Sequence, residues 1–355
     1  MSQPQVTPLP IQRALFPVRD YDLAATLSSG QAFRWNFQHG TWEGILTGRW
    51  VRLTADASSI TAQTAAPTLD WNWLTDYLQL GLDLSAVLAT FPDDEPMRAA
   101  VGSSRGLRLL RQEPWECLAS FILSSTKQIV QIRQIVALLC ERFGEPISTG
   151  DSLVVPPNPS PHPSGERAGV RGVELETFGL LTPALSSFGG GEGEKRRRLA
   201  DEPVSVAPAA LPAFSFPAAA QLARVTEADL RACKMGFRAP YLLATARVVA
   251  AGKIDLERLR QLPVEVARLE LMNLPGVGRK IADCVLLFAY GFQTAFPVDV
   301  WVMKALQQLY FPKRRASDKR LRHFAETHFG PNAGYAQQYL FHYMRTKSNL
   351  ARGTP

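Results

Sequence analysis

The chain has 355 residues and a formal net charge of +7, a length that allows two units with cores of their own. Hydrophobic residues make up 46% of it, without an uninterrupted apolar run of membrane-spanning length. The charge favours a polyanionic partner, and the first residues lack the charged and apolar regions of a secretion signal, so a cytoplasmic protein is expected.

The N-terminal part is predicted to form β-strands. Apolar and polar residues alternate at Ala32–Trp35, Thr41–Leu46 and Trp50–Thr54, with turn residues between these runs. This alternation is typical of an antiparallel sheet with one buried face. We therefore predict a β domain over residues 1–105.

Helical patterns dominate from Asp70 onward. Apolar residues recur at intervals of three and four, and one helix is expected over 128–143. The predicted fold class is α+β, in which the β domain precedes an all-helical domain made of 106–147 and 211–355.

A segment of different composition interrupts the helical part at 148–210. It has prolines throughout 156–163, glycines at 189–191 and the basic run 195–198. Such a segment cannot bury enough apolar surface to offset its ordering entropy. We expect a disordered insert, and the alternative is that its basic run serves as a DNA tether or a localisation signal.

The interval from Lys280 to Asp299 is the most informative part of the chain. Gly276 and Gly278 predict a tight turn between two helical segments, 262–273 and 279–290. Without Cβ atoms the turn can approach a phosphate closely and point its N–H groups at it.

Lys280 falls in the first turn of the second segment, and Cys284 follows one turn later on the same face. Asp299 precedes an amphipathic run and is predicted to cap a helix, which fixes its carboxylate. An amine and a fixed carboxylate beside a phosphate-binding hairpin predict nucleophilic chemistry on a nucleotide.

This hairpin, with its Lys and Asp, resembles the helix-hairpin-helix (HhH-GPD) DNA glycosylases. Four further blocks resemble the 8-oxoguanine DNA glycosylase branch in the order of that family, namely 29–35, 106–125, 236–241 and 334–341. The resemblance implies an N-terminal β domain, a helical HhH-GPD domain, and a bifunctional enzyme that excises 8-oxoguanine and cleaves the abasic site. The implied partner is double-stranded DNA containing 8-oxoguanine, with no membrane involved. The enzyme is expected to act as a monomer in a bacterial cytoplasm, associated with the nucleoid through DNA.

The resemblance assigns the chemistry to two residues. Lys280 would attack the anomeric carbon of a flipped nucleotide and form a Schiff base. Asp299 would stabilise the positive charge that develops on the sugar and assist proton transfer.

The resemblance also implies a pocket for the flipped base. The backbone carbonyl of Gly30 would detect the N7–H of 8-oxoguanine, Cys284 and Phe341 would stack on the two faces of the base, and Gln337 would read its Watson–Crick edge. The spacing agrees, since Gln337 and Phe341 are four residues apart on one helix face. Both stacking residues could instead be ordinary core residues.

A further set of residues is expected to contact DNA: Thr126, Lys127, Gln131, Phe237, Arg238, Gly276, Gly278 and Arg279. Phe237 would fill the space of the extruded base, and Arg238 would contact the orphaned partner. The chain departs from eukaryotic members at Gln131, where they carry an arginine that reads the opposite cytosine, and at Trp301, where they carry a histidine.

Cofactor expectations follow from spacing and from the resemblance. The four cysteines, Cys117, Cys140, Cys233 and Cys284, are too widely spaced for an iron–sulfur cluster. We expect no required cofactor. A monovalent cation on the hairpin carbonyls of Met272, Leu274 and Val277 is the one ion that the resemblance implies.

Two other functions are compatible with the sequence. A glycosylase of the same fold could act on alkylated bases, but such enzymes usually activate water and lack the hairpin lysine. A non-catalytic helix-hairpin-helix module would bind DNA without needing both Lys280 and Asp299.

The first prediction concerns the insert. Replacing residues 150–205 by a short Gly/Ser linker should leave folding and excision near normal, because loop length contributes little to stability. Thermal melting and single-turnover excision would check this. If the basic run reaches phosphates, the deletion will also lower the salt dependence of binding. A well-folded deletion variant with little activity would contradict the prediction.

Overall fold

The computed structural model describes residues 10–124, 128–149, 213–313 and 315–350. The predicted insert, apart from its first two residues, therefore lies outside the described residues, as do Thr126 and Lys127. Within the described ranges, no helix has the length and apolarity needed to cross a membrane.

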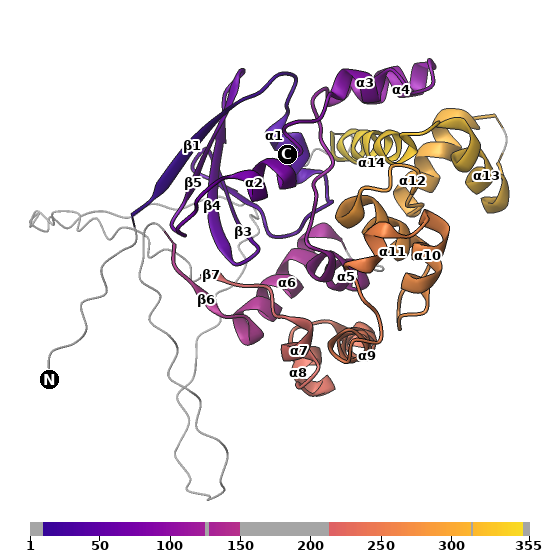
Figure 1. Cartoon of the computed structure of the whole chain (residues 1–355). Coiled ribbons are helices and arrows are strands. Elements are labelled where there is room, and N and C mark those ends of the chain that lie inside the picture. Colours follow the sequence, from indigo (N-terminus) through magenta and orange to yellow (C-terminus); the bar gives the residue numbers. More distant parts are fainter. Residues whose placement is uncertain (1–9, 125–127, 150–212, 314, 351–355) are drawn as a thin grey trace, which may run out of the picture. The chain divides into compact units, whose positions relative to one another are not determined.

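An antiparallel sheet forms the N-terminal part of the chain (Figure 1). Its strands are β1 (Gln12–Pro17), β2 (Asn36–Gln38), β3 (Thr41–Leu46), β4 (Arg49–Ala55) and β5 (Ser59–Thr64). Their spatial order is β1-β5-β4-β3-β2, so β2 to β5 form a meander and β1 pairs with β5. Leu53 stands opposite both Trp42 and Ala62 in the register, and all three side chains are buried.

Two short helices complete the core of this part. They are α1 (Leu23–Ser28) and α2 (Asn72–Leu78). Leu27 and Leu74 from these helices belong to the same buried cluster as Leu53 of the sheet. The predicted N-terminal antiparallel β domain is thus confirmed as a fold class, although its exact boundary at residue 105 stays a prediction.

The prediction of a strand at Ala32–Trp35 is wrong. The segment has irregular backbone, and side chains from elsewhere bond to Trp35 and to the preceding residue, Gln31. Gln112 Nε2 donates to the carbonyl of Gln31 at 2.7 Å, and Trp35 Nε1 donates to Tyr77 Oη at 2.8 Å. Alternating hydrophobicity here reflects burial on several sides. The other two expected strands are confirmed as β3 and β4.

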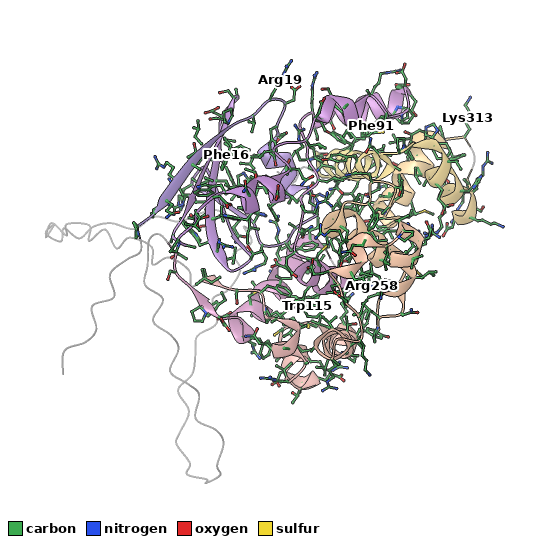
Figure 2. All side chains as sticks on the ribbon, viewed as in Figure 1. Phe16, Arg19, Phe91, Trp115, Arg258 and Lys313 are labelled. Carbon is green, nitrogen blue, oxygen red and sulfur yellow. The ribbon has the colours of Figure 1, made fainter. Side chains whose placement is uncertain are left out.

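Helices make up most of the remaining described chain (Figure 1). They are α3 (Leu84–Leu88), α4 (Glu95–Ser103), α5 (Pro114–Leu123), α6 (Ile129–Phe143), α7 (Ala219–Leu222), α8 (Glu227–Ala232), α9 (Ala239–Ala250), α10 (Val264–Met272), α11 (Arg279–Val285), α12 (Val300–Ala305), α13 (Asp318–His328) and α14 (Ala333–Leu350). The 3-10 turns are η1 (Gly236–Arg238) and η2 (Arg258–Gln261), and α11 and α12 continue into π-helical turns η3 (Leu286–Tyr290) and η4 (Leu306–Tyr310). Side chains fill the interior (Figure 2), and α6 confirms the helix expected over 128–143.

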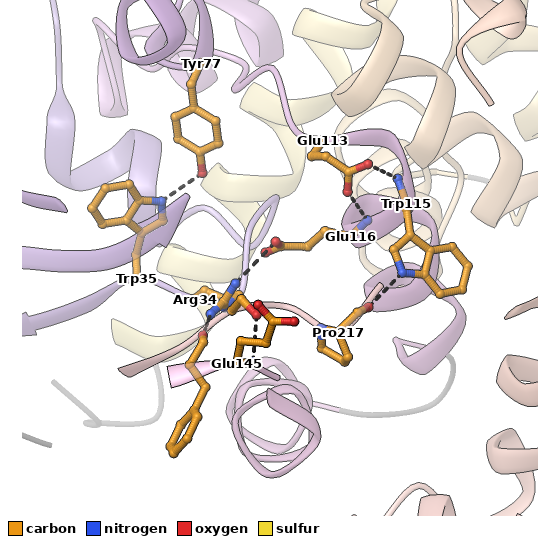
Figure 3. A network of polar contacts seen from close by, with 10 residues as sticks. Arg34, Trp35, Tyr77, Glu113, Trp115, Glu116, Glu145 and Pro217 are labelled. Carbon is orange, nitrogen blue, oxygen red and sulfur yellow. Dashed lines mark hydrogen bonds and ion pairs between the residues drawn. The ribbon is translucent and has the colours of Figure 1, made fainter. Parts of the chain in front are cut away.

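Polar contacts connect the sheet part to α5 and to the chain after residue 213 (Figure 3). The guanidinium of Arg34 forms an ion pair with Glu116 of α5 at 3.3 Å and donates to the carbonyl of Phe214. The indole N–H of Trp115 donates to the carbonyl of Pro217 at 3.0 Å. Three segments that are distant in sequence are therefore held together at one place.

A small antiparallel pair borders the insertion point. Its strands are β6 (Pro146–Ile147) and β7 (Ala213–Phe214). Just beyond them, the backbone N–H of Ser215 donates to the carbonyl of Glu145 at 2.8 Å, and the N–H of Glu145 donates to the Ser215 hydroxyl at 2.9 Å. The chain thus returns beside the point where it left.

The hairpin helices α10 and α11 are joined by a buried ion pair. Arg268 Nε of α10 lies 2.6 Å from Asp283 Oδ1 of α11, and both side chains are less than a tenth exposed. Arg268 also contacts Glu265 one turn earlier. Asp283 is therefore a structural carboxylate, and it fixes the helix that carries Lys280.

The second prediction concerns this ion pair. Asp283→Ala should lower the free energy of unfolding by about 3 kcal/mol, since the Arg268 charge would remain buried without its partner on α11. Urea denaturation would measure the change.

The neighbouring exposed pair is the matched control. Arg279 Nη2 lies 2.7 Å from Glu326 Oε1, and both side chains are half exposed. Glu326→Ala should therefore cost less than about 1 kcal/mol. Equal costs for the two variants would contradict the structural role of the buried pair.

Candidate active site

The turn of the hairpin requires glycine at one position and leaves open space at another. Gly276 has a φ of +76°, and a Cβ there would lie 2.7 Å from Cβ of Tyr241. A Cβ on Gly278 would meet nothing within 4 Å. The backbone at Gly278 therefore faces open space through which a phosphate can approach. The side chain of Arg279 is engaged with Glu326.

Lys280 is directed from the first turn of α11 toward the end of α5. Its Nζ donates to the Ser124 hydroxyl at 3.0 Å and lies 5.3 Å from the centre of the Phe121 ring. The residue is half-buried. The amine is thus held against an apolar wall while it remains accessible from one side.

Asp299 is the N-cap of α12, as the sequence predicts. Its Oδ1 accepts from the backbone N–H of Val302 at 2.8 Å. Burial raises the pKa of this carboxyl, while the Val302 N–H and the charge of Lys280 oppose the rise. The cap fixes the position of the carboxylate, and the partly apolar surroundings strengthen its electrostatic effect on any nearby cation.

One cavity of about 450 Å³ brings the two groups together with the predicted base pocket. The residues expected from the sequence that line it are Lys280, Asp299, Gly30, Cys284, Gln337 and Phe341. They come from the loop after α1, from α11, from the start of α12 and from α14. The volume suits one nucleobase, and small-molecule sites are commonly of this size.

The loop that carries Gly30 is held by buried hydrogen bonds. Gln31 Nε2 donates to the carbonyls of Thr26 and Arg108 at 3.0 and 2.8 Å, and its Oε1 accepts from the N–H of Leu110 at 2.7 Å. Gln338 Nε2 of α14 donates to the carbonyl of Ser29 at 3.1 Å. The position of Gly30 is therefore fixed before any ligand arrives.

Gly30 also needs to be glycine on steric grounds. Its φ is +83°, and a Cβ there would lie 2.6 Å from Ile129 Cδ1 and 2.9 Å from Arg345 Nη1. A side chain at this position would displace the cavity wall.

The other pocket residues have properties that suit contact with a base. Burial raises the pKa of the Cys284 thiol to about 12, so this group stays neutral and presents an apolar, polarisable surface. Gln337 is buried, and its Oε1 has no hydrogen-bond partner. A buried acceptor of this kind favours a donor from a ligand. Phe341 is only partly buried.

Several predicted DNA contacts lie outside the cavity. Phe237 is 56% exposed, as a wedge would be, whereas Arg238 is 2% exposed with its Cζ 4.2 Å from the centre of the Phe237 ring. Arg238 would have to swing outward to reach a base. Gln131 is exposed, and its Oε1 accepts from the N–H of Gln128 at 3.2 Å, which caps α6.

The structure adds residues that the sequence did not single out. Ser124 holds the amine of Lys280, and two arginines, Arg133 of α6 and Arg345 of α14, line the cavity. Arg345 follows Phe341 by four residues, so helical spacing places it on the same face as the predicted pocket residues. That signal could have identified it. Arg133 had no comparable signal, because the orientation of α6 depends on packing.

Family models match two parts of the chain. Residues 13–118 match the "8-oxoguanine DNA glycosylase, N-terminal domain", and residues 198–331 match the "HhH-GPD superfamily base excision DNA repair protein" model. The first match includes the sheet and the Gly30 loop, and the second includes the hairpin and Asp299.

Whole-length relatives agree with these matches. A "Probable N-glycosylase/DNA lyase" of Methanothermobacter thermautotrophicus is 30% identical, with 95% of this chain and 97% of the relative covered. The structure of MBOgg1 in complex with a low affinity DNA ligand has a TM-score of 0.73 at 27% identity, covering 95% and 96%. The 8-oxoguanine glycosylase/lyase of Clostridium acetobutylicum, in complex with double-stranded DNA containing cytosine opposite 8-oxoguanine, has a TM-score of 0.71 at 26% identity, covering 94% and 98%.

Proposed function

The chain belongs to the 8-oxoguanine DNA glycosylase family, and we propose that it removes 8-oxoguanine from double-stranded DNA with Lys280 as its nucleophile. It is an N-glycosylase with DNA lyase activity in base excision repair. The catalytic roles are assigned to Lys280 and Asp299 because the amine and the fixed carboxylate line one cavity of nucleobase size.

The reaction begins with a nucleotide flipped out of the duplex, because the anomeric carbon is otherwise hidden. The neutral amine of Lys280 forms a bond to C1′, and the bond from C1′ to the base breaks with its electron pair going to the base. The amine loses a proton and the base gains one. Opening of the sugar then gives a Schiff base, from which β-elimination expels the 3′ phosphate.

Asp299 stabilises the positive charge that develops on the sugar during this reaction. As the base departs, charge develops on the sugar, and a carboxylate already fixed by the Val302 N–H stabilises it without reorganisation. Ser124 positions the amine through the 3.0 Å hydrogen bond.

Two alternatives are less consistent with the site. Enzymes of this fold that remove alkylated bases usually activate water and lack the hairpin lysine, whereas Lys280 is directed into this cavity. A non-catalytic DNA-binding module would need neither the cavity nor a carboxylate with a burial-raised pKa.

Further expectations belong to the same proposal. The hairpin carbonyls of Met272, Leu274 and Val277 would hold a monovalent cation against a DNA phosphate. The carbonyl of Leu274 already accepts from the N–H of Val277 at 3.1 Å, which leaves it a second lone pair for an ion. Phe237 would fill the space of the extruded base, and Arg238 would contact the orphaned partner base. We also propose that the enzyme acts as a monomer in a bacterial cytoplasm.

The third prediction tests the nucleophile. Lys280→Gln should keep duplex binding but lose base release and the borohydride-trapped complex, since no amine remains to form the Schiff base. Asp299→Asn should slow base release by about a hundredfold with affinity nearly intact. Gel trapping with borohydride and single-turnover kinetics on an 8-oxoguanine duplex would measure both effects.

Lys253→Gln is the matched control, because Lys253 is exposed and lies outside the cavity. It should trap and excise like the wild type. Wild-type trapping by Lys280→Gln would show that another amine is the nucleophile.

The fourth prediction concerns the base opposite the lesion. A missing donor pair removes about 1–3 kcal/mol of base preference. Gln131 caps α6 with its own side chain and stands where the resemblance implies an arginine in eukaryotic members. We expect 8-oxoguanine to be excised opposite C with only a modest advantage over T, G or A. Gln131→Arg should partly restore the preference. Single-turnover rates on the four duplexes would decide, and a bias toward C of about a hundredfold, equivalent to about 2.7 kcal/mol, would refute the expectation.

A further inference from the structure

The cavity holds more positive charge than the lysine chemistry requires. Arg133 and Arg345 line it together with Lys280, and Asp299 is the one acidic residue among its described lining residues. Within the described ranges, neither guanidinium has a carboxylate within ion-pair distance. Both residues are only partly exposed. Partly burying two guanidinium groups without counter-charges is energetically unfavourable, which favours an electron-rich or anionic ligand in this cavity.

Each of the two guanidinium groups has one nitrogen atom that is shielded from solvent and lacks a partner. Arg133 Nε and Arg345 Nη1 are buried without a hydrogen-bond partner. Arg345 Nη2 donates to the carbonyl of Ser28 at 2.5 Å, which holds the guanidinium beside Gly30, where Nη1 lies 2.9 Å from the position a Cβ would take. Its Cζ is 5.8 Å from the centre of the Phe341 ring.

The two arginines remain charged although they are close together. Burial, with a smaller effect from Arg133, lowers the pKa of Arg345 to about 10, still well above neutral pH. Nearby His342 adds no further positive charge, since burial lowers its pKa to about 4 and leaves it neutral. The wall beside Gly30 therefore carries a net positive charge.

We propose that Arg133 and Arg345 bind the flipped base along its electron-rich edge and stabilise the negative charge that the base acquires as it leaves. This inference rests on the proposed function. When the bond between C1′ and the base breaks, the electron pair goes to the purine and spreads onto its carbonyl oxygens. Fixed guanidinium donors lower the energy of that state more than the energy of the neutral bound base.

A phosphate is the other anion that these arginines could bind, but burial argues against it. The unpartnered nitrogen atoms are shielded from solvent, and Arg345 Nη1 lies beside Gly30, whereas the phosphates of the duplex lie on its surface. The residues expected at the phosphates, Gly276 and Gly278, are on the exposed hairpin turn. The test must nevertheless separate the two possibilities.

The fifth prediction uses two substrates, one with a leaving base and one without. Arg133→Met and Arg345→Met should each slow single-turnover release of 8-oxoguanine by about tenfold or more, and the double variant by about a hundredfold. Cleavage and borohydride trapping on a duplex with a preformed abasic site should change much less, since no base departs. Arg133→Lys, which keeps the charge, should recover most of the release rate.

The controls address folding and charge. Arg98→Met removes one exposed arginine outside the cavity and should leave both rates unchanged. Normal trapping on abasic DNA shows that each cavity variant is folded. Duplex affinity is measured in the Lys280→Gln background, in which the base stays attached.

The outcomes distinguish a failure of the arginine inference from a failure of the proposed function. Equal losses on both substrates, no loss on either, or weaker duplex affinity with a smaller salt slope would overturn the arginine inference and leave the proposed function intact. A wild-type protein that cleaves abasic DNA but releases no 8-oxoguanine would overturn the proposed function itself.

Discussion

The buried ion pair between Arg268 and Asp283 is the interaction on which the site depends. It joins the two helices of the hairpin, so the turn that is open to phosphate and the helix that carries Lys280 move as one body. Lys280 is three residues from Asp283, and Cys284 is adjacent to it. A shift of α11 by even 1 Å would separate the amine from Ser124 and change the cavity wall, and misplacement on this scale strongly reduces catalysis.

The cavity itself is assembled from segments that are far apart in the sequence. The Gly30 loop is fixed by Gln31 to the chain at 108–110 and by Gln338 to α14. These contacts join side-chain amides to backbone groups in the buried interior, where a lost partner is costly. The pocket is therefore formed before the nucleotide enters, and specificity depends on groups that do not rearrange.

Much of this site could be predicted from the sequence, because its main signals are local. Helical spacing places Lys280 with Cys284 and Gln337 with Phe341, and the Asp299 cap is a feature of one chain segment. The strand expected at Ala32–Trp35 was wrong because burial on several sides imitates alternation. The burial of Arg238, the ion pair of Arg279 and the inward position of Arg133 depend on tertiary packing, which no local pattern encodes.

The strand pair β6–β7 bears on where an additional domain can be inserted into this fold. Paired antiparallel strands hold the two chain ends about 5 Å apart, and many folded domains have neighbouring termini of their own. The β6–β7 pair is therefore a position at which another domain can be inserted without disrupting the fold of this chain. From the cavity-lining Arg133 to the last residue of helix α6, Phe143, the chain advances ten residues, or about 15 Å, and the strand pair follows there. A fluorescent reporter or a second DNA-binding domain inserted there would be attached beyond the end of α6 that lies away from Arg133.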